Sequence, residues 1–209
     1  MKSDFLYLEI GVAIDLYTMR KIILASNSPR RKELMHQVGF DFEVKSKDFD
    51  EVIRIELDVK EVSKYLAQQK NDAYRKLFTS EIIVTADTVV IVEDQILGKP
   101  YNSEEAKQML LQLSNRTHSV MTGVCISSNE KKISFDDSTN VTFKKLDSNE
   151  IDFYINKFKP YDKAGAYGIQ EWIGMIGIET IQGSYYNVMG LPINKVYNCF
   201  KNEFAIAPY

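Results

Sequence analysis

The chain has 209 residues, of which 44% are hydrophobic and 26% charged, with only 10 glycines and 5 prolines. This composition is close to the globular average and excludes an intrinsically disordered or collagen-like chain. The formal net charge is −3 and the pI about 5.5, so the chain lacks the cationic surplus that duplex nucleic acid requires. We expect no stable nucleic-acid binding, whereas a small anionic ligand needs only a local cluster of positive groups.

Cysteine and histidine are too sparse to build a metal site from these residues. The chain contains two cysteines far apart, Cys125 and Cys199, and two histidines, His36 and His118. We expect both thiols to be buried in a reducing compartment, which predicts a cytoplasmic protein. Any metal must be held by carboxylates and ligand oxygens, a donor set that suits magnesium or manganese.

Residues 1–18 are apolar at first sight, but Glu9 and Asp15 interrupt them and no small-residue cleavage site follows. The segment is therefore expected to be neither a signal peptide nor a membrane span. Met19 directly precedes the first clear strand and is a second candidate start. We interpret residues 1–18 as an N-terminal extension, with a packed extra element as the alternative, and residues 19–209 as a single domain.

The first half of the chain alternates strands and helices. A strand at Lys21–Ala25 leads through a loop into a helix from Pro29 to Val38, with Ser28 as its N-cap and Gly39 after its end. The elements expected next are a short strand, a helix, a buried strand, a tight hairpin and a helix, at 42–45, 59–77, 82–86, 88–97 and 103–113.

The second half is predicted to begin with a long antiparallel hairpin, because residues 117–127 and 133–146 are rich in β-branched side chains and flank a polar turn. Asp147 and Glu150 then form a capping box for a helix. A glycine-punctuated loop and strand region and a final helix follow, at 160–190 and from about 192. We therefore predict an α/β fold with one mixed sheet and a cleft between two lobes.

The string LASNSPRRKEL places Ser26, Ser28, Arg30 and Arg31 where a buried strand ends and a helix begins. Free backbone N–H groups and the helix dipole attract anions at such a junction, and two guanidinium groups can bind phosphate oxygens bidentately. The signature of a nucleotide P-loop is absent. These residues alone fit equally well a capped surface helix with two solvated arginines.

The string VTADTVV puts Asp87, followed by Thr88, at the end of the buried strand. A carboxylate there is costly unless it is paired or coordinating, so Asp87 is a candidate general base or metal ligand, with turn capping as the alternative. Lys99 in LGKP is held between Gly and Pro. Lys70 in LAQQKNDAY also fits an ordinary exposed helix lysine.

The string DKAGAYGIQ holds Lys163 and Gln170 around two glycines, and QGSYYNVMGLP follows shortly after. Small residues at this density indicate backbone packed close to a ligand or to another strand. The alternative for both strings is the chemistry of tight β-turns.

Seven strings occur in one order along the chain: LASNSPRRKEL, LAQQKNDAY, VTADTVV, LGKP, LSNRTHSVMTGV, DKAGAYGIQ and GSYYNVMGLP. With these seven strings, the chain resembles the Maf proteins, which are nucleotide pyrophosphatases related in fold to inosine triphosphate pyrophosphatases. The resemblance extends from about Met19 to Tyr197. The resemblance implies an elongated mixed β-sheet flanked by helices, with an active-site cleft between two lobes. It also implies hydrolysis of a nucleoside triphosphate to the monophosphate and pyrophosphate, which cleanses nucleotide pools.

The resemblance assigns roles to individual residues. It makes Asp87 the proton acceptor, and Glu51 together with Asp87 the ligands of a divalent cation, Mg²⁺ or Mn²⁺. It links substrate choice to Arg30, Thr88 and Gln170, and the block KAGAYGIQ resembles the branch that acts on dTTP and UTP. The other residues expected to bind the substrate are Ser26, Arg31, Lys70, Lys99 and Lys163.

Two departures from the family pattern stand out. Glu171 and Trp172 follow Gln170 where many members have Gly, and Asn115 stands where Gly is common. We expect dTTP and UTP as substrates, with modified pyrimidine nucleotides as further candidates. The rival function is a non-catalytic nucleotide sensor that regulates cell division, but a pure binder has no need of both Asp87 and Glu51 beside a polyanion. The sequence leaves a homodimer open.

Overall fold

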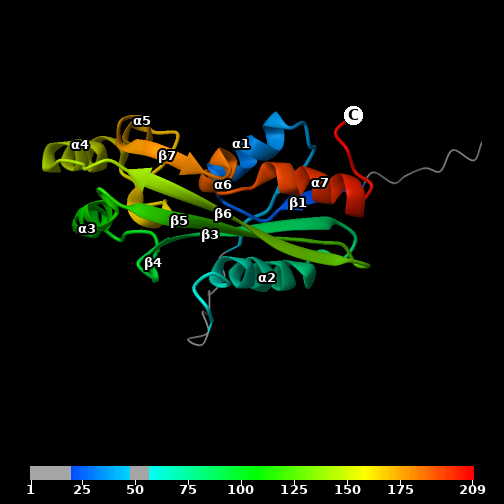
Figure 1. Ribbon diagram of the computed structural model, residues 1–209. Coiled ribbons are helices and arrows are strands. Elements are labelled where there is room, and N and C mark those ends of the chain that lie inside the picture. Colours follow the sequence, from blue (N-terminus) through cyan, green and yellow to red (C-terminus); the bar gives the residue numbers. More distant parts are fainter. Residues whose placement is uncertain (1–19, 48–56) are drawn as a thin grey trace, which may run out of the picture.

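The computed structural model describes residues 20–47 and 57–209 as a seven-stranded mixed sheet with helices on both faces (Figure 1). The sheet order is β2-β1-β3-β5-β6-β7, and β4 pairs with β3 outside this path. The strands are Ile22–Leu24 (β1), Glu43–Val44 (β2), Ile82–Val92 (β3), Gln95–Leu97 (β4), Thr117–Ser127 (β5), Lys132–Phe143 (β6) and Ile178–Gln182 (β7). Residues 1–18, the expected N-terminal extension, and Glu51, the expected metal ligand, lie outside the described residues.

The helices gather in three places around this sheet. One face carries α2, the other carries α1, α6 and α7, and the remaining helices lie at one end (Figure 1). Their bounds are Pro29–Gln37 (α1), Val62–Arg75 (α2), Ser103–Leu113 (α3), Ser148–Phe158 (α4), Trp172–Gly177 (α5), Tyr185–Val188 (α6) and Ile193–Glu203 (α7), with a 3₁₀ turn at Ala164–Ala166 (η1). None of the helices in the described ranges is long and apolar enough to cross a membrane.

Helix α1 begins and ends with the residues that the sequence predicts. The Ser28 hydroxyl accepts a hydrogen bond from the Arg31 backbone N–H, and Pro29 occupies the first helical position. Gly39 follows the helix at a φ of +83°, a conformation that glycine adopts without strain. The predicted capping box of Asp147 and Glu150 at the start of α4 is also confirmed.

The predicted break between two strands at Asp87 is wrong. Strand β3 runs without interruption through this residue to Val92, so Asp87 lies in the middle of a strand. The polar pair Asp87 and Thr88 interrupts the apolar run in the sequence. The pairing of β5 with β3 is nevertheless continuous from Ile83 to Ile91, so the strand does not end at Asp87. The predicted hairpin with β4 exists, and its first half is the end of β3.

The other edge of β3 has two partners with a gap between them. Parallel β1 pairs with β3 as far as Val84, and antiparallel β4 pairs with it from Val90 onward. Among the described residues, positions 85–89 of β3 therefore pair with β5 alone. This gap leaves one stretch of sheet edge open to side chains and ligands.

Alternation along β3 sends neighbouring side chains to opposite faces of the sheet. Val84 and Ala86 pack in one cluster with residues of α1 and α7, while Val89 and Ile91 pack with residues of α2. Asp87 consequently lies on the face covered by α2, and the next residue along the strand lies on the face covered by α1.

Two large apolar clusters occupy the two ends of the sheet. One lies between β1, the start of β3, α1 and α7, and includes Leu34 and Phe200. The other surrounds the far half of β3 with α3, α4 and α5, and includes Leu110, Ile151 and Tyr154. These clusters are the two predicted lobes, joined by one continuous sheet. The structure thus confirms the predicted mixed α/β fold.

The region 160–190 holds more structure than the sequence predicts. It was expected to be a loop and strand region, and it contains η1, α5, β7 and α6. The longest of these elements has six residues, which is too short for a helical period of apolar residues to be recognised.

Helix α2 packs directly on β5 at Gly123, opposite Asp87. A β-carbon at Gly123 would lie 2.2 Å from the Lys64 backbone nitrogen. Gly123→Ala is therefore expected to lower the free energy of unfolding by about 3 kcal/mol, because helix and strand must move apart. Urea unfolding measures this loss. Gly98→Ala is the matched control, since a β-carbon there has no atom within 4 Å, and equal losses in the two variants would contradict the prediction.

Candidate active site

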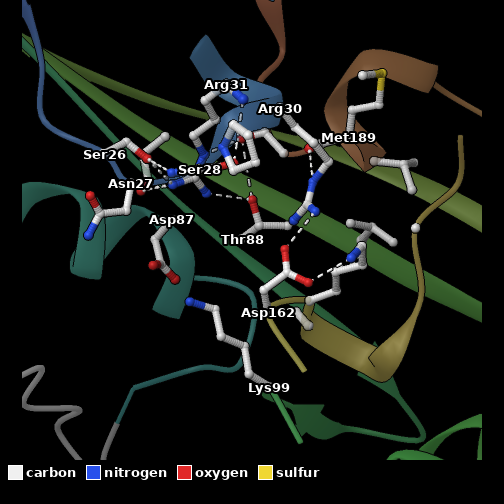
Figure 2. Close-up of a pocket in the computed structure, with 18 of the residues that line it drawn as sticks. Ser26, Asn27, Ser28, Arg30, Arg31, Asp87, Thr88, Lys99, Asp162 and Met189 are labelled. Carbon is white, nitrogen blue, oxygen red and sulfur yellow. Dashed lines mark hydrogen bonds and ion pairs between the residues drawn. The ribbon is translucent and has the colours of Figure 1, made fainter. Parts of the chain in front are cut away.

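One cavity of about 330 Å³ lies at the open edge of β3 (Figure 2). It is lined by residues from both lobes, including the loop before α1 and the segment around η1. All the predicted site residues that the structure describes line it: Ser26, Arg30, Arg31, Lys70, Asp87, Thr88, Lys99, Lys163 and Gln170. Residues that are scattered along the sequence are therefore brought together in one place.

Arg31 fills the gap at the edge of β3. Its Nη1 atom donates to the Ala86 carbonyl at 2.8 Å and to Ser26 Oγ at 3.3 Å. Its Nη2 atom donates to Thr88 Oγ1 at 3.0 Å, and its Nε atom donates to the Gly190 carbonyl at 2.7 Å. These bonds tie α1 to β3 and to the loop between α6 and α7. They also give a β3 carbonyl a donor where the sheet edge is open.

Arg30 and Lys163 are linked through Asp162, as Figure 2 shows for the Arg30 side. Arg30 Nη1 lies 3.2 Å from Asp162 Oδ2, and Lys163 Nζ lies 2.6 Å from Asp162 Oδ1. Burial alone would raise the pKa of Asp162, but the hydrogen bond from Lys163 and the charge of Arg30 bring it below its usual value. Asp162 therefore stays ionised and holds the two cations at the cavity wall.

Asp87 and Lys70 form an ion pair on the α2 face of β3. Lys70 Nζ lies 2.7 Å from Asp87 Oδ1, and the two side chains are 20% and 16% exposed. In Figure 2 the amino group of Lys99 also points toward the Asp87 carboxylate. The carboxylate is thus accessible from the cavity and surrounded by positive charge.

The cavity carries a strong positive charge in a protein whose net charge is −3. Among the described residues, two carboxylates line it, Asp87 and Asp162, against six cations, which is a surplus of four positive charges. The N-terminus of α1 adds a further attraction for anions. The cations are Arg30, Arg31, Lys47, Lys70, Lys99 and Lys163.

Gln170 lines the cavity. It lies in a turn that the Glu171 N–H closes by donating to the Gly168 carbonyl at 3.0 Å. Its Oε1 atom is buried and has no hydrogen-bond partner among the described residues. Because buried polar atoms are nearly always paired, this oxygen is an exception, and it reaches a ligand only if the side chain turns toward the cavity.

Sequence reasoning missed several lining residues, among them Lys47, Tyr74 and Asp162. Lys47 follows β2, which runs parallel to β1, and parallel strands end at the same edge of a sheet. This rule would have placed Lys47 near the loop before α1. Tyr74 accepts the backbone N–H of Lys47 at 2.6 Å, a contact that the sequence does not reveal.

Among the described residues, one carboxylate in the cavity is suited to bind a divalent cation. Within residues 20–47 and 57–209, no group of three or more His, Cys, Asp or Glu side chains could hold a metal ion. Magnesium usually takes one or two carboxylates and completes its shell with water and substrate phosphates. Asp87, beside the cations of the cavity, fits that donor set.

Fold and cavity together define an α/β protein with a cationic pocket suited to a small polyanion. The family model of the Maf-like proteins matches residues 21–203, and the chain belongs to this family. The predicted family is thus confirmed.

Two relatives illustrate the similarity. The chain is 50% identical over 184 residues to a dTTP/UTP pyrophosphatase of Parabacteroides distasonis, covering 87% of this chain and 95% of that protein. It is 51% identical over 186 residues to a dTTP/UTP pyrophosphatase of Porphyromonas gingivalis, covering 87% and 94%. Among solved structures, the Staphylococcus aureus Ham1 protein is 16% identical, with a TM-score of 0.45 over 59% of this chain and 72% of that chain.

Tyr167 lines the cavity and is held from behind by His118 of β5. The His118 Nε2 atom lies 2.8 Å from the Tyr167 hydroxyl, and the imidazole stacks on Phe143. His118 is only 2% exposed. Burial lowers the pKa of His118 from its ordinary 6.5 to about 4, because the charged form would lose its hydration.

This pKa predicts a loss of stability in mild acid. Above pH 6.5 the His118 imidazole is neutral in both states; as the pH falls toward about 4, only the unfolded chain takes up the proton. The free energy of unfolding should therefore decrease, by roughly 2 kcal/mol at pH 5 and roughly 3 kcal/mol at pH 4 from this group alone. Urea unfolding at pH 7.5 and pH 5 should show a smaller decrease in His118→Gln, whose amide does not titrate. Equal decreases in the variant and the wild type would be evidence against the lowered pKa of His118 as the cause.

Proposed function

We propose that this protein is a nucleoside triphosphate pyrophosphatase that hydrolyses dTTP and UTP to the monophosphate and pyrophosphate. The main support for this function is the surplus of four positive charges in the lining of the cavity. This surplus matches the roughly four negative charges of a triphosphate at neutral pH. The names of the two relatives support the same reaction and the same bases. The role that follows is the cleansing of nucleotide pools.

The phosphates are bound by the cations of the cavity and the N-terminus of α1. A hydrogen bond to a charged group contributes about 1.5–3 kcal/mol, and a helix N-terminus about 0.3–1 kcal/mol, so the charged side chains dominate. Arg30 and Lys163 now share Asp162, and phosphate oxygens compete with that carboxylate for both. Lys99 adds an ammonium group from the hairpin exit.

Asp87 acts as the proton acceptor in this proposal. A water molecule attacks the α phosphorus, its proton passes to the Asp87 carboxylate, and pyrophosphate leaves from the opposite side. Lys70, at 2.7 Å, holds the carboxylate in place. The remaining cations stabilise the negative charge that develops on the pyrophosphate.

We further propose that the reaction uses magnesium or manganese. Asp87 would hold this cation together with phosphate oxygens, and Glu51 is the second carboxylate in the proposal. When bound, such a cation neutralises part of the charge on the phosphates and polarises the P–O bonds. Metal dependence is measured by pyrophosphate release with magnesium, with manganese and after chelation.

Asp87→Asn is expected to reduce kcat at least a hundredfold with little change in folding. The amide keeps the size of the side chain but cannot accept the proton, and general-base catalysis contributes about 10²- to 10⁴-fold. Pyrophosphate release from UTP measures the loss, and thermal unfolding checks the fold. Near-wild-type turnover in this variant would remove Asp87 from the mechanism.

Gln170 is proposed to recognise the base. Its amide offers an acceptor and a donor side by side, which complements the N3–H donor and O4 acceptor of uracil or thymine. In this proposal the Gln170 side chain turns toward the cavity, and its Oε1 atom, which has no partner among the described residues, accepts the hydrogen bond from N3–H. Cytosine presents an unprotonated N3 and an amino group, and would leave this oxygen facing an acceptor, a mismatch of about 1–3 kcal/mol.

Wild-type protein is expected to cleave UTP and dTTP at least tenfold better than CTP, ATP or GTP, and Gln170→Ala should lose most of this preference. The measurement is kcat/KM for the five nucleotides. A purine preference, or full pyrimidine selectivity in the variant, would contradict the assignment. Binding of UTP without pyrophosphate release by the wild type would favour a nucleotide sensor over an enzyme.

A further inference from the structure

Glu171 connects two parts of the site without itself being among the described residues that line the cavity. Its Oε1 atom lies 3.1 Å from Lys163 Nζ. Its Oε2 atom accepts a hydrogen bond from the hydroxyl of Tyr154, a residue with no exposed surface. The two carboxylate oxygens therefore serve different partners, one on the phosphate side and one in the core of a lobe.

Tyr154 links Glu171 to the turn that carries Gln170. The Tyr154 hydroxyl accepts the Gly168 N–H at 3.1 Å, and the Glu171 N–H donates to the Gly168 carbonyl. Together with the bond from Tyr154 to Glu171, these contacts form a closed ring of three hydrogen bonds around the turn. A β-carbon at Gly168 would lie 2.8 Å from Glu171 Cδ, so the carboxylate packs directly on this glycine.

Glu171 also supplies a counter-charge to Lys163, whose ammonium group needs one because the residue is only 7% exposed. The other carboxylate on Lys163, that of Asp162, is 54% exposed and shared with Arg30. The Glu171 side chain is 20% exposed and lies on the side of the Gln170 turn. Lys163 therefore has a second carboxylate partner that is not shared with Arg30.

We propose that Glu171 is a positioning residue that sets both specificity and rate. Its Oε1 atom orients Lys163 toward the phosphates, and its Oε2 atom, acting through Tyr154, fixes the turn that presents Gln170 to the base. This inference rests on the proposed function. Because the two oxygens have different partners, substitutions can separate the two effects.

Tyr154→Phe removes the hydroxyl and leaves the contact between Glu171 and Lys163 in place. The Gly168 N–H loses its acceptor and the Gln170 turn loosens, so the ratio of kcat/KM for UTP to that for CTP should fall about tenfold. Inhibition by pyrophosphate, which reports the phosphate subsite without a base, should not change. The ratio is independent of the fraction of folded protein, so it remains informative if the variant is less stable. Tyr101→Phe, at a residue 92% exposed, is the matched control.

Glu171→Gln keeps an acceptor for the Tyr154 hydroxyl and removes the charge opposite Lys163. We expect kcat to fall about tenfold for UTP and CTP alike, with the ratio between them retained, because a displaced ammonium no longer meets the leaving pyrophosphate. A purely electrostatic effect would differ, since removing a negative charge would lower KM and leave kcat unchanged. Glu179→Gln, on exposed β7, controls for the change in net charge.

The outcomes separate this inference from the proposed function. A wild-type UTP to CTP ratio in Tyr154→Phe overturns the role of Glu171 in specificity, and wild-type kcat in Glu171→Gln overturns its role through Lys163. Thermal unfolding of each variant shows whether the protein is folded at the assay temperature. Absence of UTP hydrolysis in the wild type would instead overturn the proposed function.

Discussion

The interruption in strand pairing along one edge of β3 is the constraint on which the site depends. Strand β1 pairs with β3 only as far as Val84, and β4 pairs with β3 only from Val90 onward, so the backbone between these two residues needs partners from elsewhere. Arg31 supplies one by binding the Ala86 carbonyl, and it joins α1 to the loop at Gly190 with the same guanidinium. The side chain that completes the sheet edge also brings a positive charge to the cavity, so one guanidinium serves both the fold and the charge of the site.

The alternation of β3 then divides the site between two faces. Asp87 and Thr88 are adjacent in the chain, yet the first pairs with Lys70 of α2 and the second with Arg31 of α1. Two helices on opposite sides of the sheet can therefore contribute to one cavity. The close packing of α2 at Gly123, opposite Asp87, lies beside the Lys70 pair and shows how tightly that helix is held against the sheet.

The sequence predicts most of the fold and of the cavity, because capping residues, long β-branched runs and charged residues beside glycines are local signals. The prediction was wrong at Asp87, where a polar pair suggested a strand end that the long β5 ladder overrides. It also could not reveal the link from Glu171 to Tyr154, which joins residues on separate elements through tertiary packing. The roles proposed for individual residues remain predictions, and Glu51 lies outside the described residues.

The position of the cavity between two apolar clusters has a consequence for unfolding. Arg30 belongs to α1, which packs in one cluster, whereas Gln170 follows η1 at the other. A nucleotide that touches both residues is a non-covalent cross-link between the lobes. Ligands that bind only the folded state stabilise it by mass action, and a cross-linking ligand also opposes the separate opening of either lobe. A nucleotide bound to both residues is therefore expected to make the two clusters unfold as one cooperative unit.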